Sequence, residues 1–227
     1  MLWLKLHHSP GVVHIFFCLL PPAICQLSPL DLRPVPAYKC PALIQRRAIF
    51  LDRDGTLIEE KNYLRRPEDI AVFPGAARAL RRLLAAGFKL FIVSNQSGVG
   101  RGLFTMQDVA RIHTRLAALL ARQGVHFQKI YVAPEAPDQH SRSRKPSPQF
   151  LFDARDEFGL RLEQCYFVGD KLSDLECGWN AGLKKCLLVR TGYGLQVEKS
   201  ADPRLALAVV VDDLPAAADW ILRECLK

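Results

Sequence analysis

The 227-residue sequence has no apolar run long enough to form a transmembrane helix, which needs about 20 residues. Its longest apolar run, Val12–Leu20, has nine residues and includes His14. This run is too short to span a bilayer. The sequence also has no internal repeat and no low-complexity tract.

Cys-x-x-Cys pairs are absent, although the sequence has seven cysteines. The number is odd, and Cys165 and Cys186 lie within apolar runs, which is typical of buried free thiols in a reducing compartment. No spacing of cysteine and histidine suits a zinc cluster. The cysteines therefore favour a cytoplasmic protein that does not depend on disulfides.

The composition is that of one globular domain, with 49% hydrophobic and 24% charged residues. The formal charge of +8 admits nucleic acid, a membrane surface or a small acidic molecule as partner. Half of that charge lies in residues 1–47, which hold five basic residues and one acid. The remaining chain has 26 basic and 22 acidic residues, so its excess is modest.

Residues 1–45 differ from the rest of the chain, with seven of the 15 prolines and three of the six histidines. A basic start, an apolar run and Pro21-Pro22 loosely imitate a secretory signal, but no small-x-small cleavage site follows. A true signal is one interpretation. A disordered extension and a misassigned start are two others, and we favour these two. We expect the globular domain to comprise residues 46–227.

From Arg46 onward, short apolar strands alternate with amphipathic helices. Glycines and capping residues mark the helix ends, for example Thr105 with Asp108 three residues on, and Ser147 as N-cap before Pro148. This alternation predicts an α/β fold with a mostly parallel sheet and helices on both faces. The expected strands are 48–52, 88–93, 127–132, 165–168, 186–189 and 209–211, and the expected helices are 75–86, 105–123, 148–158, 173–181 and 214–226.

Polar side chains follow several of these strands, where the sheet's carboxyl edge should place a ligand. Asp52 and Asp54 follow the first strand, Ser94 ends the second, and Asp170 with Asp174 follows the fourth. The third strand is followed by a basic loop, Arg142–Pro146, that includes Lys145. Each segment alone is more often a turn, a helix entry or a solvated charge, but all of them follow predicted strands. Their joint occurrence therefore indicates an active site.

The chemistry of these residue types is coherent. Clustered carboxylates suit Mg²⁺, which prefers oxygen ligands and accepts a phosphate oxygen. A carboxylate can attack phosphorus once a cation and a lysine neutralise the phosphoryl oxygens. A second aspartate can then protonate the leaving oxygen and later activate water.

This ordered set resembles the haloacid dehalogenase (HAD) superfamily, over residues 46–225. Asp52-x-Asp54-Gly55-Thr56, Ser94, Lys145 and Gly169-Asp170-x-x-x-Asp174 match its four motifs. The resemblance implies a Rossmann-like domain in which Asp52 is the nucleophile and Asp54 the general acid and base. It also implies Mg²⁺ held by Asp52, the Asp54 carbonyl and Asp170, while Ser94 and Lys145 bind the phosphoryl group.

Spacing excludes a separate cap domain, since only 41 residues separate Asp52 from Ser94 and 50 separate Ser94 from Lys145. Segments such as Ser94–Gly98 and Leu188–Gly194 resemble a capless branch, the D-glycero-D-manno-heptose 1,7-bisphosphate 7-phosphatases and histidinol-phosphatases. The guanidinium of an arginine such as Arg144 can form two parallel hydrogen bonds to a phosphate, which suits the second phosphate of a bisphosphate substrate. The resemblance implies that the substrate pocket is lined by Arg53, Glu60, Lys61, Asn62, Tyr63, Asn95, Gln96, Ser97, Arg144 and Lys171.

One segment departs from that branch, whose typical members carry a Cys/His zinc loop before Arg-Lys-Pro. Here Ala133–Ser143 has no cysteine and one histidine, so zinc is not expected. We expect prolines and local hydrogen bonds to hold this loop instead.

The leading hypothesis is thus a Mg²⁺-dependent phosphatase that removes the 7-phosphate of a heptose bisphosphate, for lipopolysaccharide-core or related precursors. Histidinol-phosphate phosphatase is the nearest alternative, and a nucleic-acid 3′-phosphatase is a third. No platform of interleaved aromatic and basic residues is visible, which argues against nucleic acid. We expect a monomer that acts on a small anionic sugar phosphate and has no nucleic-acid or membrane partner.

Overall fold

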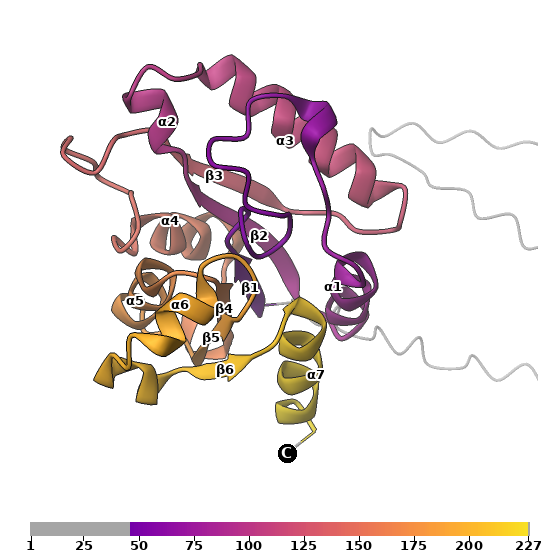
Figure 1. The fold of residues 1–227 in the computed structure, drawn as a ribbon. Coiled ribbons are helices and arrows are strands. Elements are labelled where there is room, and N and C mark those ends of the chain that lie inside the picture. Colours follow the sequence, from indigo (N-terminus) through magenta and orange to yellow (C-terminus); the bar gives the residue numbers. More distant parts are fainter. Residues whose placement is uncertain (1–45, 227) are drawn as a thin grey trace, which may run out of the picture. The chain divides into compact units, whose positions relative to one another are not determined.

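The computed structural model describes residues 46–226, and these residues form a single α/β domain (Figure 1). The predictions for residues 1–45 lie outside the described part of the chain. A six-stranded sheet runs through the domain in the order β3-β2-β1-β4-β5-β6, with every neighbouring pair parallel. The strands are β1 Ala48–Leu51, β2 Lys89–Asn95, β3 Lys129–Ala133, β4 Tyr166–Gly169, β5 Lys185–Val189 and β6 Val209–Val211.

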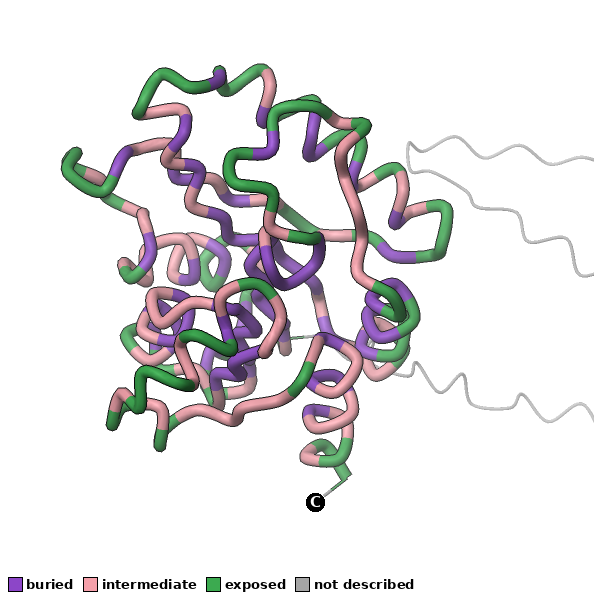
Figure 2. Tube along the Cα trace, viewed as in Figure 1, coloured by how far each residue is buried: buried purple, intermediate pink, exposed green. Residues whose placement is uncertain are grey.

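Helices cover both faces of this sheet. Successive residues of a strand point to opposite faces, so each strand contributes side chains to both helical layers. In β1, Ile49 and Leu51 belong to one buried cluster, whereas Ala48 and Phe50 belong to the other. The first cluster includes residues of α1 Ala76–Ala85, α3 Met106–Ala121 and α7 Leu214–Glu224, and the second includes residues of α4 Gln149–Phe158 and α5 Leu172–Asn180. Figure 2 shows the buried strands between these helical layers.

All six predicted strands and the five predicted helices are confirmed, with small shifts at their ends. The capping box of Thr105 and Asp108 is also confirmed. Ser147 as N-cap is wrong, because α4 begins at Gln149 with Pro148 as N-cap. The Ser147 hydroxyl donates to the Arg142 carbonyl at 2.8 Å and accepts from the Gln149 N–H at 3.4 Å. The prediction omitted two short helices, α2 Ser97–Gly100 and α6 Gly194–Lys199, and three 3-10 turns, Pro67–Asp69, Leu162–Gln164 and Pro203–Leu207.

The connections between strands agree with the expected absence of a cap. From β1 to β2 the chain forms one 3-10 turn and α1, and from β2 to β3 it forms α2 and α3. Within residues 46–226, no helix is both long and apolar enough to cross a bilayer.

Candidate active site

The strand order brings the predicted site residues to one edge of the sheet. β1 lies between β2 and β4, so the residues that follow these three strands are neighbours in space. Asp52 follows β1 directly, Ser94 lies near the end of β2, and Asp170 follows β4. The site therefore lies at the carboxyl ends of the central strands, where open parallel sheets bind ligands.

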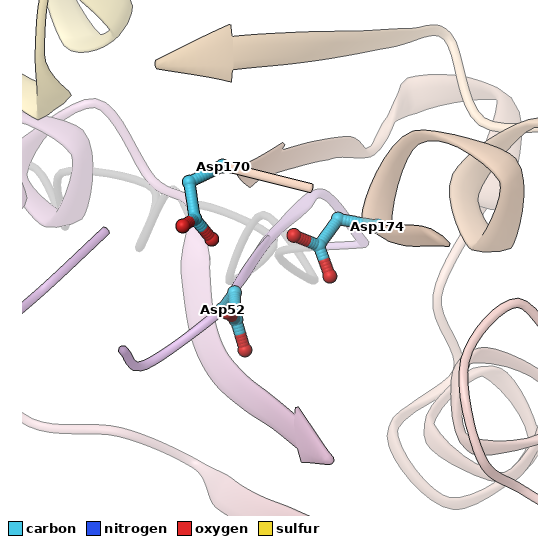
Figure 3. A group of neighbouring side chains, drawn as sticks. All are labelled: Asp52, Asp170 and Asp174. Atoms are coloured by element: carbon cyan, nitrogen blue, oxygen red, sulfur yellow. The ribbon is translucent and has the colours of Figure 1, made fainter. Parts of the chain in front are cut away.

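Three buried carboxylates approach each other there (Figure 3). One oxygen from each of Asp52, Asp170 and Asp174 lies within 4.8 Å of the others. Burial, together with the negative charges of Asp52 and Asp174, raises the pKa of Asp170 to about 8. Burial also raises the pKa of Asp174. Such mutual repulsion is relieved when a cation binds among the carboxylates.

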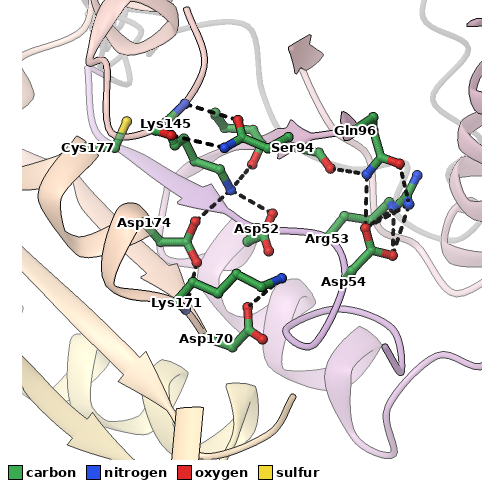
Figure 4. Close-up of polar contacts among 12 residues, drawn as sticks. Asp52, Arg53, Asp54, Ser94, Gln96, Lys145, Asp170, Lys171, Asp174 and Cys177 are labelled. Atoms are coloured by element: carbon green, nitrogen blue, oxygen red, sulfur yellow. Dashed lines mark hydrogen bonds and ion pairs between the residues drawn. The ribbon is translucent and has the colours of Figure 1, made fainter. Parts of the chain in front are cut away.

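Lys145 joins two of these carboxylates. Its Nζ lies 2.7 Å from Asp52 Oδ1 and 2.6 Å from Asp174 Oδ1, and it also donates to the Val93 carbonyl at 2.8 Å (Figure 4). Against the effect of burial, the carboxylates of Asp174 and Asp52 raise the pKa of Lys145. Burial opposes ionisation of Asp52 as well, but the charges of Lys145 and Lys171 and the hydrogen bonds to Asp52 together outweigh burial and lower the pKa of Asp52. Asp52 is therefore an ionised carboxylate in a buried setting.

Asn95 holds the backbone of Lys145 in place. Its side-chain amide donates to the Lys145 carbonyl at 3.1 Å and accepts from the Lys145 N–H at 3.0 Å. The lysine comes from a long loop, so this two-point contact fixes the loop to the end of β2.

Asp54 belongs to a second polar network beside the carboxylates. Arg53 donates to both oxygens of Asp54 through Nε and Nη2, at 2.7 to 3.1 Å. Gln96 Nε2 donates to Asp54 Oδ2 at 3.0 Å and to Ser94 Oγ at 2.7 Å (Figure 4). Ser94 Oγ thus accepts from Gln96, which leaves its own proton for another acceptor.

A polar pocket of about 240 Å³ opens above Asp54. Across it, Lys171 Nζ lies 3.4 Å from Glu60 Oε2 and 4.8 Å from the ring centroid of Tyr193. Against the effect of burial, the charges of Asp52 and Asp170 raise the pKa of Lys171. Eight of the ten predicted substrate residues line this pocket: Arg53, Glu60, Asn62, Tyr63, Asn95, Gln96, Ser97 and Lys171.

Two predicted substrate residues are not among those lining it. Lys61 Nζ pairs with Glu59 at 2.7 Å on the exposed surface. Arg144 donates through Nη1 to the Glu135 carbonyl at 2.9 Å, so its guanidinium ties its own loop together. The sequence could place these side chains near the site but could not show which way they point.

Sequence reasoning missed several residues that the fold brings to the site. Asp174 belongs to a sequence motif, but the motif does not predict its contact with Lys145. Tyr193 donates its backbone N–H to Asp170 Oδ2 at 2.9 Å, and Thr191 Oγ1 donates to the Gly55 carbonyl at 2.5 Å. His113 contacts Arg53 from α3, and nothing in the helical pattern distinguished it from a core residue.

The donor set fits a hard divalent cation. Buried Asp170 Oδ1 has no hydrogen-bond partner among the described residues. Gly55 and Gly192, both at positive φ, pack so closely that a Cβ on either would collide with Asp170 Oδ2. Oxygen ligands without nitrogen or sulfur favour Mg²⁺ over zinc.

Comparison with known proteins agrees with this geometry. The HAD-hydrolase-like family model matches residues 142–217. Together with the fold and the site, this match defines the class as HAD-like hydrolases.

Relatives within that class are more specific. The D-glycero-D-manno-heptose-1,7-bisphosphate 7-phosphatase of Thermosynechococcus vestitus is 36% identical over 188 residues, covering 78% of this chain and 95% of the relative. The D-glycero-beta-D-manno-heptose-1,7-bisphosphate 7-phosphatase of Yersinia pestis is 34% identical, covering 77% and 89%. The D,D-heptose 1,7-bisphosphate phosphatase of B. bronchiseptica, solved with magnesium and phosphate, superposes with a TM-score of 0.73 at 31% identity, covering 78% and 99%. The chain belongs to this family of HAD-like 7-phosphatases.

Proposed function

We propose that the protein is a Mg²⁺-dependent phosphatase that hydrolyses the 7-phosphate of D-glycero-D-manno-heptose 1,7-bisphosphate. The observation that carries the proposal is the placement of ionised Asp52 against Lys145 Nζ at 2.7 Å, with Asp170 and Asp174 beside it. The named activities of relatives that align over most of the chain supply the substrate.

In the first step, an oxygen of Asp52 attacks phosphorus and the bond from phosphorus to the sugar oxygen breaks. Asp54 gives its proton to that leaving oxygen, so the sugar departs as a neutral alcohol. Lys145 and the free proton of Ser94 contact the phosphoryl oxygens. Asp174 positions Lys145 through a second ion pair, in which Lys145 Nζ lies 2.6 Å from Asp174 Oδ1.

In the second step, Asp54 takes a proton from water, and the water oxygen attacks the aspartyl-phosphate. The bond from phosphorus to Asp52 breaks, inorganic phosphate leaves and the Asp52 carboxylate is restored. Asp54 then holds the proton needed for the next substrate.

Mg²⁺ would be held by Asp52, Asp170 and the Asp54 carbonyl, and it would supply positive charge to the phosphoryl oxygens. Asp174 lies within the same carboxylate cluster, but Lys145 and the Lys171 N–H already occupy its two oxygens. We therefore assign Asp174 to lysine positioning.

The pocket above Asp54 suits the polyhydroxylated part of the substrate. Glu60, Asn62 and Lys171 offer both hydrogen-bond acceptors and donors to sugar hydroxyls. Lys171 also provides a positive charge at the pocket wall. We further propose a cytoplasmic monomer, with residues 46–227 as the catalytic domain.

A phosphate-release assay tests the substrate. With Mg²⁺, kcat/KM for the heptose bisphosphate should exceed that for histidinol phosphate or a 3′-phosphorylated oligonucleotide by about tenfold or more, because only the heptose matches a pocket built for hydroxyls. A histidinol phosphate preference of the same size would contradict the proposal.

Asp52→Asn tests the nucleophile. It should lower turnover by about a thousandfold or more, since the amide cannot form the aspartyl-phosphate. Asp156→Asn, which changes an exposed aspartate paired with Arg155, serves as the matched control and should turn over normally. Unchanged turnover in Asp52→Asn, with normal thermal unfolding, would contradict the mechanism.

A further inference from the structure

Arg53 is a buried cation whose guanidinium has acceptors on both sides. Its side chain is 1% exposed, although arginine is rarely buried so fully. Nε and Nη2 form a fork on the Asp54 carboxylate, and Nη2 also donates to Gln96 Oε1 at 3.1 Å. On the opposite side, Nη1 lies 3.0 Å from Nε2 of His113.

The tautomer of His113 follows from this contact. Arginine can only donate, so His113 Nε2 must accept and the ring carries its proton on Nδ1. Burial, aided by the charge of Arg53, lowers the pKa of His113 to about 3. The imidazole of His113 is therefore neutral at near-neutral pH, where we expect the enzyme to work.

We propose that His113 is a positioning residue for Asp54, acting through Arg53. By accepting from Nη1, the ring fixes the plane of the guanidinium, and the opposite edge of that plane then holds the Asp54 carboxylate at the pocket floor. The inference rests on the acid and base role proposed for Asp54.

A neutral acceptor suits this task better than an acid. A carboxylate at position 113 would compete with Asp54 for the guanidinium, whereas an imidazole satisfies Nη1 without drawing the charge away. An apolar side chain there would leave a buried N–H without a partner, which is costly. Arg53 would then turn toward other acceptors, and Asp54 would follow it.

The reaction itself offers a readout of Asp54 alignment. A sugar phosphate has a poor leaving group that needs protonation, whereas an aryl phosphate such as p-nitrophenyl phosphate leaves without help. Because kcat/KM reports the first step, a misplaced acid should lower kcat/KM for the alkyl substrate far more than for the aryl one. A residue that merely supports the fold would affect both substrates equally.

Three variants at this position make the test. His113→Gln keeps a neutral acceptor at the distance of Nε2, His113→Asn keeps the amide but shortens the reach, and His113→Leu removes the acceptor. His126→Gln, at an exposed histidine, is the control. The alkyl substrate is the best sugar phosphate found for the unmodified enzyme, so a wrong substrate assignment does not affect this test.

We expect His113→Asn and His113→Leu to lose about tenfold or more in kcat/KM on the alkyl phosphate and less than about threefold on the aryl phosphate. His113→Gln should recover most of the loss, with KM little changed throughout. Equal losses on both substrates, no loss, or a failure of His113→Asn and His113→Leu to fold would overturn the inference, because each outcome makes His113 a core residue only.

Discussion

At the scale of single residues, the site depends on atoms that are absent as much as on those present. Gly55 and Gly192 approach Asp170 from two loops, each at a positive φ that favours glycine. The missing side chains allow the Asp170 carboxylate to lie between them, with Tyr193 N–H donating to Oδ2 at 2.9 Å. Asp170 Oδ1 has no hydrogen bond from the described residues and lies 4.0 Å from Lys171 Nζ, which leaves room for the cation proposed above.

Substitution at one of these glycines tests that arrangement. Gly192→Ala should raise the Mg²⁺ concentration needed for half-maximal turnover by about tenfold or more, because its Cβ would displace Asp170. Mg²⁺ titration of turnover measures the change.

Gly182→Ala is the matched control. Gly182 also has positive φ, but a Cβ added there would meet no atom within 4 Å, so alanine should strain only the backbone. A similar Mg²⁺ requirement in the two variants would show that crowding of Asp170 is not the cause.

At the scale of elements, the loop between β3 and α4 shows how a segment without cysteines can bring Lys145 to the carboxylates. The Ser141 hydroxyl donates to Glu135 Oε2 at 2.8 Å and accepts from the Arg144 N–H at 3.0 Å. Arg144 Nη1 returns to the Glu135 carbonyl. The local hydrogen bonds expected from the sequence are therefore confirmed.

Loss of the Ser141 hydroxyl should loosen this loop. We expect Ser141→Ala to lower the free energy of unfolding by about 1 kcal/mol and to lower turnover severalfold, because Lys145 follows this network directly. Ser143→Ala, which removes a neighbouring hydroxyl while keeping the backbone N–H that Ser143 donates to Ser141, is the control. Equal turnover in the two variants would contradict a positioning role, and metal analysis should find no zinc in either.

At the scale of the whole molecule, the order of strands in the sheet determines which loops lie side by side at the site. β1 is central, and its residues pair with both β2 and β4. Backbone contacts begin at the first described residues: the Arg161 N–H donates to the Arg46 carbonyl at 2.8 Å and the Lys89 N–H to the Arg47 carbonyl at 2.9 Å. These bonds tie Arg46 and Arg47 to later segments of the described chain.

Truncation tests where the domain begins. A chain that starts at Arg46 should keep kcat/KM within about twofold, since it retains β1 and these bonds. A chain that starts at Phe50 loses Ala48 and Ile49, both fully buried, and should fail to unfold cooperatively on heating. Full activity in the shorter chain, or none in the longer, would contradict the proposed boundary.

Much of the fold and most of the site could be predicted because local chemistry marks them. Apolar runs of strand length and helix-capping residues such as Thr105 specify their elements regardless of neighbours. Acids directly after strands predict a site because strand ends converge in a parallel sheet. By contrast, α2 and α6 are too short for a periodic pattern, and their stability comes from tertiary contacts.

By itself, the sequence determined the class of fold, the carboxylates and the lysine of the site, since these depend on pattern and residue chemistry. Only the tertiary structure decided that Lys145 bridges Asp52 and Asp174, that Arg144 turns back to its own loop, and that His113 lies behind Arg53. These contacts join residues far apart in the chain, and which rotamers they adopt depends on packing that no local pattern encodes.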